Sequence, residues 1–264
     1  MAAPLNSVTF DLWQTLILDT PEISRPRSQR RLNGILQVLK QDGHNYAYED
    51  LQRANRSSFK ILDAIRDQEL KDVTFDEQID IYIKEVNAAL PAILSQAARS
   101  AIVREYVDSY MENPPTVDEC AVETLGKVRD LGLKMGLICN TGATPGMTQR
   151  VFLKQVGIAQ FFDILVFSDE ERLSKPAPRI FELTLERLSA TAAETVHVGD
   201  HGLNDVVGAK KAGLRAIWLR RKPEDVPAVA PDVSIDSLRE TPTALVELRG
   251  LEAGHQLTGL LPAT

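Results

Sequence analysis

The amino-acid sequence predicts an α/β fold, in which helices cover both faces of a parallel sheet, together with an all-helical insert. Three observations predict it: short apolar runs typical of buried strands, helical patterns between the later runs, and a long helical stretch after the first run. Strands that alternate with helices form parallel sheets, because a parallel connection has to cross over the sheet. We therefore expect a doubly wound, Rossmann-like core that carries a helical cap.

The strands of the sheet are predicted from short runs rich in Val, Ile, Leu and Phe, each bounded by turn residues. These runs lack the polar alternation of a strand that has one face in water, so each strand should be buried on both faces. In chain order, the predicted strands are Ser7–Leu12, Lys134–Cys139, Phe162–Phe167, Thr195–Val198 and Arg215–Leu219. The helical patterns of the core are Val117–Leu131, Thr144–Val156, Pro178–Leu188 and Leu203–Ala212.

The stretch from about Pro21 to Asn113 contains no strand pattern. Its apolar residues repeat at helical spacing in three segments, and a fourth helix is predicted from Ile93 to Met111, before two prolines end it. A helical block placed directly after the first strand indicates an insert that folds over the core, although helices that merely pack against the sheet are an alternative. The expected divisions are a core of residues 1–16 and 116–250, a cap of residues 17–115 and a loosely ordered tail of residues 251–264.

Composition and charge exclude several classes of partner. The net charge of −7 and the isoelectric point near 5.2 argue against a surface for nucleic acid or an anionic membrane, which requires clustered Lys and Arg. The two cysteines are too few for a disulfide framework, and no apolar run approaches the ~20 residues of a membrane span. The N-terminal residues lack the pattern of a secretory signal. We expect a cytoplasmic monomer or homodimer that acts on a small molecule.

The ends of the predicted strands carry the candidate site residues. In a parallel α/β sheet, ligands bind at the carboxyl ends of the strands, where the strand order reverses. Each of these residues alone has an ordinary interpretation as a turn former, a helix cap or a solvated loop residue, but together they indicate a site. In chain order they are Asp11, Trp13 and Thr15; Cys139, Asn140 and Thr141; Lys175; and Asp200 and Asp205.

These four strand ends resemble, in the same order, the four motifs of the haloacid dehalogenase-like hydrolase superfamily. The segment FFDILVFSDEERLSKPAPRIFE is similar to the third motif region of that family, and VHVGDHGLNDVVGAKKAGLRAIWL is similar to the fourth. The helical stretch stands where the family carries a small cap domain. The resemblance covers nearly the whole chain, and it implies a Mg²⁺-dependent hydrolase with an aspartyl nucleophile.

Hydrolysis of a phosphate ester through a covalent intermediate requires an unprotonated nucleophile and a countercharge for the phosphoryl oxygens. The resemblance implies that Asp11 is the nucleophile, that Asp11 and Asp200 bind Mg²⁺, and that Asp205 is a third ligand or a neighbour of the ligands. It also implies that Trp13 offers its main-chain carbonyl to the metal and that Lys175 neutralises the charge shared by Asp11 and the phosphoryl group.

The remaining roles are also implied by the resemblance. Thr15 would orient Asp11 through its hydroxyl. Cys139, Asn140 and Thr141, together with Lys175, would bind the phosphate. Cys139 stands where the family has Ser or Thr, and a thiol is a poor hydrogen-bond donor, so Asn140, Thr141 and backbone N–H groups are expected to make most of the contacts.

Trp13 is the main departure from the family pattern. Family phosphatases have a second Asp at this position, which protonates the leaving group and later activates water. A Trp side chain transfers no protons, and general acid–base catalysis contributes typically about 10²- to 10⁴-fold. Gln14 also replaces the small Gly of the pattern, and we expect it to reshape the loop that leads into the insert. Trp13 either packs at the sheet edge or faces the substrate.

Three functions follow as alternatives. The first is a Mg²⁺-dependent phosphohydrolase that favours good leaving groups or takes a proton donor from the insert, which offers His44, Lys40, Lys60 and Glu49 among others. The second is a 2-haloacid dehalogenase, whose motif also lacks the second Asp. The third is a ligand-binding relative that has lost turnover.

The dehalogenase alternative requires a cation from the insert to hold the substrate carboxylate. The candidates are Arg25, Arg27, Arg30 and Arg31. Against this alternative stand Asp200 and Asp205, because displacing a halide from carbon requires no metal.

Overall fold

The structure, a computed structural model, describes residues 4–222 and 224–257 of the chain. Its main sheet has six parallel strands in the order β5-β4-β1-β6-β7-β8. The chain runs outward from β1 on one side and then returns to continue outward on the other, so the strand order reverses between β1 and β6. The strands are β1 (Ser7–Phe10), β4 (Lys134–Cys139), β5 (Ile164–Phe167), β6 (Thr195–Gly199), β7 (Arg215–Leu219) and β8 (Val233–Ile235).

The five strands predicted from the sequence are confirmed, with end residues that shift by no more than two positions. Three further strands were not predicted because each is only two or three residues long. One of them is β8. The other two, β2 (Ile17–Leu18) and β3 (Thr116–Val117), pair antiparallel where the chain leaves and re-enters the core.

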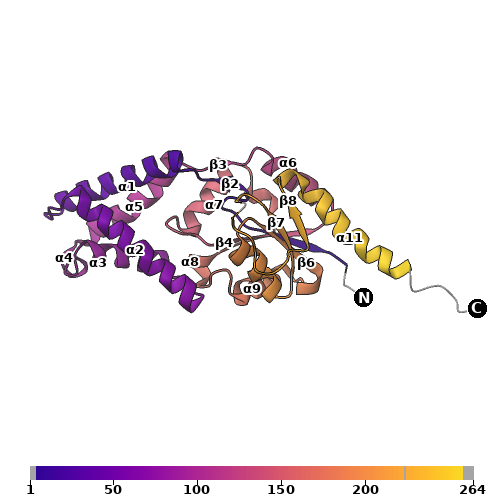
Figure 1. Cartoon of the computed structure of the whole chain (residues 1–264). Coiled ribbons are helices and arrows are strands. Elements are labelled where there is room, and N and C mark those ends of the chain that lie inside the picture. Colours follow the sequence, from indigo (N-terminus) through magenta and orange to yellow (C-terminus); the bar gives the residue numbers. More distant parts are fainter. Residues whose placement is uncertain (1–3, 223, 258–264) are drawn as a thin grey trace, which may run out of the picture.

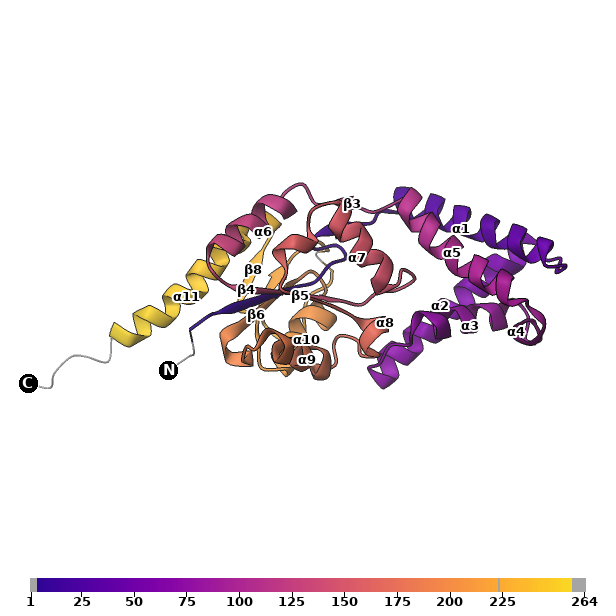
Figure 2. The same cartoon turned by 180° about the vertical axis from the view of Figure 1, so that it is seen from behind.

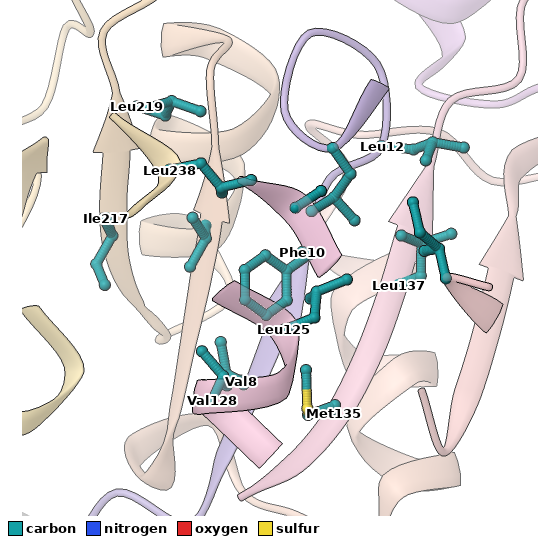
Figure 3. Packing of buried hydrophobic residues seen from close by; sticks show 14 of the residues in the cluster. Val8, Phe10, Leu12, Leu125, Val128, Met135, Leu137, Ile217, Leu219 and Leu238 are labelled. Atoms are coloured by element: carbon teal, nitrogen blue, oxygen red, sulfur yellow. The ribbon is translucent and has the colours of Figure 1, made fainter. Parts of the chain in front are cut away.

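Helices cover both faces of the sheet, as Figures 1 and 2 show. On one face, residues of α6 (Ala121–Asp130), α7 (Gly146–Gln155) and α11 (Thr241–Leu257) pack against apolar side chains of β1 and β4. Figure 3 shows Phe10 within this cluster. α9 (Pro178–Leu188) and α10 (Gly208–Lys211) pack against the other face of the same sheet. Adjacent residues of β4 point to opposite faces, Leu137 to the first cluster and Ile138 to the second.

Two predicted segments differ in the structure. The helix expected over Leu203–Ala212 is a π-helix, Gly202–Val207, followed by the single turn of α10. Within the tail expected over residues 251–264, residues 251–257 continue α11, and residues 258–264 lie outside the described part of the chain. Sequence analysis missed α11 because no strand follows it to mark a crossover. A short helix α8 (Ser168–Glu171) follows β5 directly.

The helices between β2 and β3 form a bundle at one end of the molecule (Figures 1 and 2). Their apolar residues make a hydrophobic cluster of their own, which includes Leu32, Leu51 and Ile79. Threonine and serine side chains begin two of the helices, because Thr74 accepts from the Glu77 N–H and Ser95 from the Ala98 N–H. The helices are α1 (Pro21–Gln41), α2 (Tyr48–Glu69), α3 (Phe75–Val86), α4 (Leu90–Ile93) and α5 (Gln96–Glu112). Within the described residues, no helix is long and apolar enough to cross a bilayer.

Candidate active site

The carboxyl ends of β1 and β6 bring three acidic side chains together at the point where the strand order reverses. Asp11 follows β1, and Asp200 and Asp205 follow β6. The Asp11 N–H donates to the carbonyl oxygen of Val198 at 2.9 Å, which extends the parallel pairing of β1 and β6 up to Asp11. One carboxylate oxygen from each of the three aspartates lies within 4.8 Å of the others. Residues far apart in sequence thus form one acidic cluster, as the strand-end argument predicts.

Lys175 lies inside this acidic cluster. Its Nζ is 2.6 Å from Asp11 Oδ1 and 2.7 Å from Asp205 Oδ1, and the residue is only 2 % exposed. Burial by itself lowers the pKa of Lys175, but the charges of Asp11 and Asp205 outweigh it and hold the pKa above its usual value. Lys175 is therefore a fixed cation that shares its charge between two carboxylates.

The electrostatics of the cluster leave negative charge uncompensated. Burial raises the pKa of Asp11 to about 6, against the opposing effect of Lys175. Burial, with the charges of Asp11 and Asp205, raises the pKa of Asp200 to about 8. The buried Oδ2 of Asp11 has no hydrogen-bond partner among the described residues. Hard divalent cations prefer carboxylate oxygens of this kind, so Asp11 and Asp200 fit a metal that would favour their ionised forms.

Asp205 has all of its oxygens occupied by protein donors. Besides Lys175, His197 Nε2 lies 3.2 Å from Oδ1, and the His201 N–H donates to Oδ2 at 2.9 Å. Burial raises the pKa of Asp205, but Lys175 and His197 more than reverse this and hold it below its usual value. A Cβ at Gly199 would lie 2.3 Å from Asp205 Cγ, so only glycine leaves room for this carboxylate. Asp205 is thus placed to position Lys175.

His197 is a positioning residue that sequence analysis missed. It is fully buried in β6, and its Nδ1 lies 2.8 Å from Thr9 Oγ1 on the neighbouring strand. Thr9 and His197 are paired in the parallel register of β1 and β6. A signal in the sequence could have identified it. Thr9 and His197 are polar residues within apolar strands, and buried polar groups require partners.

The loop after β4 holds Lys175 through its backbone. Asn140 Nδ2 donates to the Lys175 carbonyl and Asn140 Oδ1 accepts the Lys175 N–H, both at 2.9 Å. The Thr141 N–H donates to Ser168 Oγ at 2.9 Å, and Ser168 Oγ donates to Asp72 Oδ2 at 2.5 Å. Asn140 and Thr141 both line the cavity in front of the acidic cluster. The buried bond from Ser168 to Asp72 also joins the core to the helical bundle.

Two predicted site residues lie elsewhere. The Cys139 side chain is buried, its Sγ lies 3.2 Å from Gln149 Oε1, and it is not among the residues that line the cavity, so its expected role in phosphate binding stays a prediction. Burial raises the pKa of this thiol well above its usual value. The hydroxyl of Thr15 is buried without a hydrogen-bond partner among the described residues, so the predicted bond to Asp11 is absent. Cys139 belongs to the hydrophobic core cluster beneath the strand ends.

Trp13 both packs against a neighbouring aromatic ring and lines the cavity, so neither interpretation from the sequence is excluded. Its ring packs edge-on against Tyr110 with centroids 6.2 Å apart, and it also lines the cavity. Gln14 adopts a left-handed backbone conformation with φ of 60°. Glycine, the residue of the family pattern, adopts this conformation more easily than a residue with a Cβ. The Gln14 Nε2 donates to the carbonyl of Asp19 at 3.0 Å, which ties the loop to the start of the helical bundle.

The cavity has a volume of about 590 Å³ and lies between the strand ends and the helical bundle. Of the proton donors offered by the bundle, His44, Lys40, Lys60 and Glu49 do not line it. Arg30 does not line it either. The bundle residues that line it include Arg25, Arg27, Ser28, Arg31, Asn55 and Phe59.

Known proteins match parts of this sequence. A family model described as haloacid dehalogenase-like hydrolase matches residues 5–213. A phosphoserine phosphatase of Thermus thermophilus is 37 % identical over 118 residues, which are 44 % of this chain and 46 % of that protein. A glyceraldehyde 3-phosphate phosphatase of Pyrococcus abyssi is 33 % identical over 100 residues, 38 % of this chain and 41 % of that one. The chain spans about half the length of the curated relatives it matches.

Solved structures share the fold over nearly the whole chain. A 2-haloacid dehalogenase from Pseudomonas syringae superposes with a TM-score of 0.68 at 21 % identity, covering 92 % of this chain and 99 % of that one. A phosphatase of the same family from Thermococcus onnurineus superposes with a TM-score of 0.61 at 23 % identity, covering 91 % and 98 %. Given the family match over residues 5–213, this chain belongs to the haloacid dehalogenase-like hydrolase family.

Proposed function

We propose that this hydrolase is a Mg²⁺-dependent phosphohydrolase that acts on a small phosphorylated metabolite through the nucleophile Asp11. The observation that supports this most directly is the cluster of Asp11, Asp200 and Asp205, whose oxygens lie within 4.8 Å of one another, with Lys175 bridging two of them. The cluster lines a cavity of about 590 Å³, which is large enough for a small metabolite. The matched curated relatives include a phosphoserine phosphatase and a glyceraldehyde 3-phosphate phosphatase, which also favours this class.

In this proposal, Asp11 and Asp200 hold the metal and Asp205 does not bind it directly. The Oδ2 of Asp11 is unpartnered, whereas both oxygens of Asp205 already accept protein hydrogen bonds. Trp13 would add its main-chain carbonyl, as the family resemblance implies. When bound, Mg²⁺ would neutralise charge between the carboxylates and the phosphoryl oxygens.

The chemical step is transfer of the phosphoryl group to Asp11. A carboxylate oxygen of Asp11 forms a bond to phosphorus while the bond from phosphorus to the ester oxygen breaks, and the leaving group departs as an oxyanion with the electron pair. Water then attacks the aspartyl phosphate, which releases inorganic phosphate and regenerates the Asp11 carboxylate. Lys175 provides a fixed positive charge next to the nucleophile throughout, and Asn140 holds Lys175 by two backbone hydrogen bonds.

Trp13 gives the leaving group no proton, and two other polar residues that line the cavity, His201 and Asp19, already hold hydrogen-bond partners. His201 Nδ1 accepts the N–H groups of Leu203 and Asn204 at 3.2 and 3.4 Å. The two oxygens of Asp19 accept from the Arg27 guanidinium at 2.8 and 3.0 Å. We therefore propose that the enzyme favours substrates with good leaving groups, such as acyl or aryl phosphates.

The helices of residues 17–115 are proposed to act as a cap over the core of residues 1–16 and 116–250. Their side chains form one wall of the cavity, and a lid in this position excludes water and large substrates. We propose that the substrate is a small molecule and that neither nucleic acid nor a membrane is a partner. The arrangement fits a monomer or a homodimer. Cys120 and Cys139 are both free, in keeping with a cytoplasmic location.

A 2-haloacid dehalogenase is the second candidate, and Trp13 favours it. Displacement of halide from carbon requires no leaving-group acid, so a tryptophan at this position would not impair it. The acidic cluster favours the phosphohydrolase, because Asp200 is unnecessary without a metal.

Turnover of aryl, acyl and alkyl phosphates and of 2-chloropropionate, each with Mg²⁺ and with EDTA, tests these assignments. The expected result is Mg²⁺-dependent hydrolysis of aryl and acyl phosphates that the Asp11→Asn variant loses by at least about 10³-fold, as expected for a covalent nucleophile. Asp236→Asn, at an exposed ion pair with Arg220, serves as a control that retains activity. Halide release that persists in EDTA would assign the dehalogenase reaction. No turnover above background with any of these substrates would show a relative that only binds ligands.

A further inference from the structure

Arg31 on α1 is a buried cation without an acidic partner. It is only 5 % exposed and lines the same cavity as Asp11. Two neighbouring arginines of the helix are differently placed, because Arg27 forms a salt bridge with Asp19 at 2.8 Å and Arg30 pairs with Glu105 and Glu112. Among the described residues, Arg31 forms no such pair.

The contacts of Arg31 leave part of its guanidinium unsatisfied. Its Cζ lies 4.4 Å from the centroid of the Tyr106 ring, and its Nη2 lies 3.5 Å from Asn55 Oδ1, a long hydrogen bond. Its Nε is buried and has no hydrogen-bond partner among the described residues. A buried charge without a counterion is strongly unfavourable, so the position of Arg31 requires either an anion or a compensating stacking contact.

The surroundings of Arg31 favour an anion. Asn55, Ser28 and the exposed Arg25 line the same part of the cavity wall from α1 and α2. The planar guanidinium of arginine matches a carboxylate or phosphoryl group with two parallel hydrogen bonds.

We propose that Arg31 and Asn55 form a second oxyanion subsite, which binds an acidic group at the end of the substrate opposite the phosphoryl group. This proposal rests on the proposed function, since it assumes that the reacting phosphoryl group lies at Asp11. The substrate is then a small phosphate ester that carries a carboxylate or a second phosphoryl group. Arg31 is a specificity residue, and Asn55 positions its guanidinium.

The competing role for Arg31 is purely structural, as a stacking partner of Tyr106. A structural role predicts that Arg31→Met lowers the stability of the protein but leaves the ratio of affinities for acidic and neutral ligands unchanged. The subsite predicts a change in that ratio. The matched control is Arg30→Met, on the same helix but outside the cavity lining.

The test is binding of unreactive phosphonates to the Mg²⁺-loaded protein by titration calorimetry. Methylphosphonate carries one anionic group, phosphonoacetate and 3-phosphonopropionate add a carboxylate, and propane-1,3-diphosphonate adds a second phosphoryl group. We expect at least one two-ended probe to bind the native protein about 10- to 100-fold more tightly than methylphosphonate, the range for a hydrogen bond to a charged group. The preferred probe identifies the acidic group as a carboxylate or a second phosphoryl group.

Arg31→Met should remove this preference and leave the affinity for methylphosphonate within about threefold, while Arg31→Lys should keep part of it. Arg30→Met should keep all of it, and a melting curve for each variant confirms that it is folded. Equal preference in the native protein and in Arg31→Met would overturn the subsite, even if phosphate esters are hydrolysed normally. Conversely, acid-selective binding that depends on Arg31 in a protein without phosphatase turnover would support the subsite and reject the proposed reaction.

Discussion

Lys175 Nζ lies 2.6 Å from Asp11 Oδ1, although 164 positions separate the two residues in sequence. The contact is buried on both sides, with side-chain exposures of 2 % and 8 %. The contact depends on three strand ends. Asp11 follows β1, and Asn140, after β4, holds the Lys175 backbone by hydrogen bonds. Asp205, after β6, accepts a hydrogen bond from the same ammonium group. This ion pair is therefore a sensitive reporter of the assembled site.

Lys175→Met should destabilise the metal-free protein by about 3–5 kcal/mol, because it leaves buried carboxylates without their cation. The measurement is urea unfolding at pH 8 in EDTA. Lys127→Met is the control, since Lys127 and Glu123 form an exposed pair and their loss should change the free energy of unfolding by less than about 1 kcal/mol. Equal stability of the two variants would show that Lys175 does not compensate the cluster.

Magnesium affinity should rise as the pH rises from about 6 to about 8. Asp200 has a pKa raised to about 8 and Asp11 a pKa raised to about 6, and a carboxyl group has to lose its proton before it binds the metal. Between these two values one proton, from Asp200, should leave for each ion bound, which strengthens binding by up to about tenfold for each pH unit. Below pH 6 a second proton, from Asp11, opposes binding as well.

Calorimetric titration in buffers of different ionisation enthalpy measures both the affinity and the proton release. Asp200→Asn should bind Mg²⁺ more weakly and lose the dependence between pH 6 and 8. An affinity that stays constant from pH 5.5 to pH 9 would contradict the assignment of these two aspartates as ligands.

Trp13→Asp should raise the rate on alkyl phosphates relative to aryl phosphates by at least about tenfold, because an alkyl leaving group depends most on a proton donor. Trp13→Asn is the matched control, since it has nearly the same shape and loses the same contact with Tyr110 but carries no transferable proton. The measured quantity is the ratio of kcat/KM values for the two substrates, which is independent of the fraction of folded enzyme. The same ratio in both variants would mean that a carboxyl group at this position does not reach the leaving group.

Gln14→Gly should be more stable than Gln14→Ala by about 1 kcal/mol. The φ of 60° at this position is strained for a residue with a Cβ but not for glycine. Both variants lose the hydrogen bond to Asp19, so the difference between them isolates the backbone effect. Thermal and urea unfolding measure it, and a more stable Ala variant would show that the loop relaxes out of the left-handed conformation.

The sequence by itself determined five of the six strands of the main sheet, the helical bundle and the set of acidic residues at the strand ends. Each of these depends on a local pattern: continuous apolar runs for buried strands, helical spacing for the bundle, and a polar residue directly after a strand. Parallel strands place their carboxyl ends at one edge of the sheet, whatever segments connect them. The proximity of Asp11 and Asp200 could therefore be predicted from the sequence.

Only the tertiary structure decided how the side chains at that edge are paired. Thr15 and Cys139 stand at the expected positions, yet the Thr15 hydroxyl makes no hydrogen bond to Asp11 and Cys139 packs in the core. His197, an unexpected residue, contacts Asp205. Likewise, four arginines of the insert were equivalent candidates in sequence, and burial and ion pairing single out Arg31. The physical reason is that a side chain's partners depend on packing between segments distant in the chain, and no local pattern records that packing.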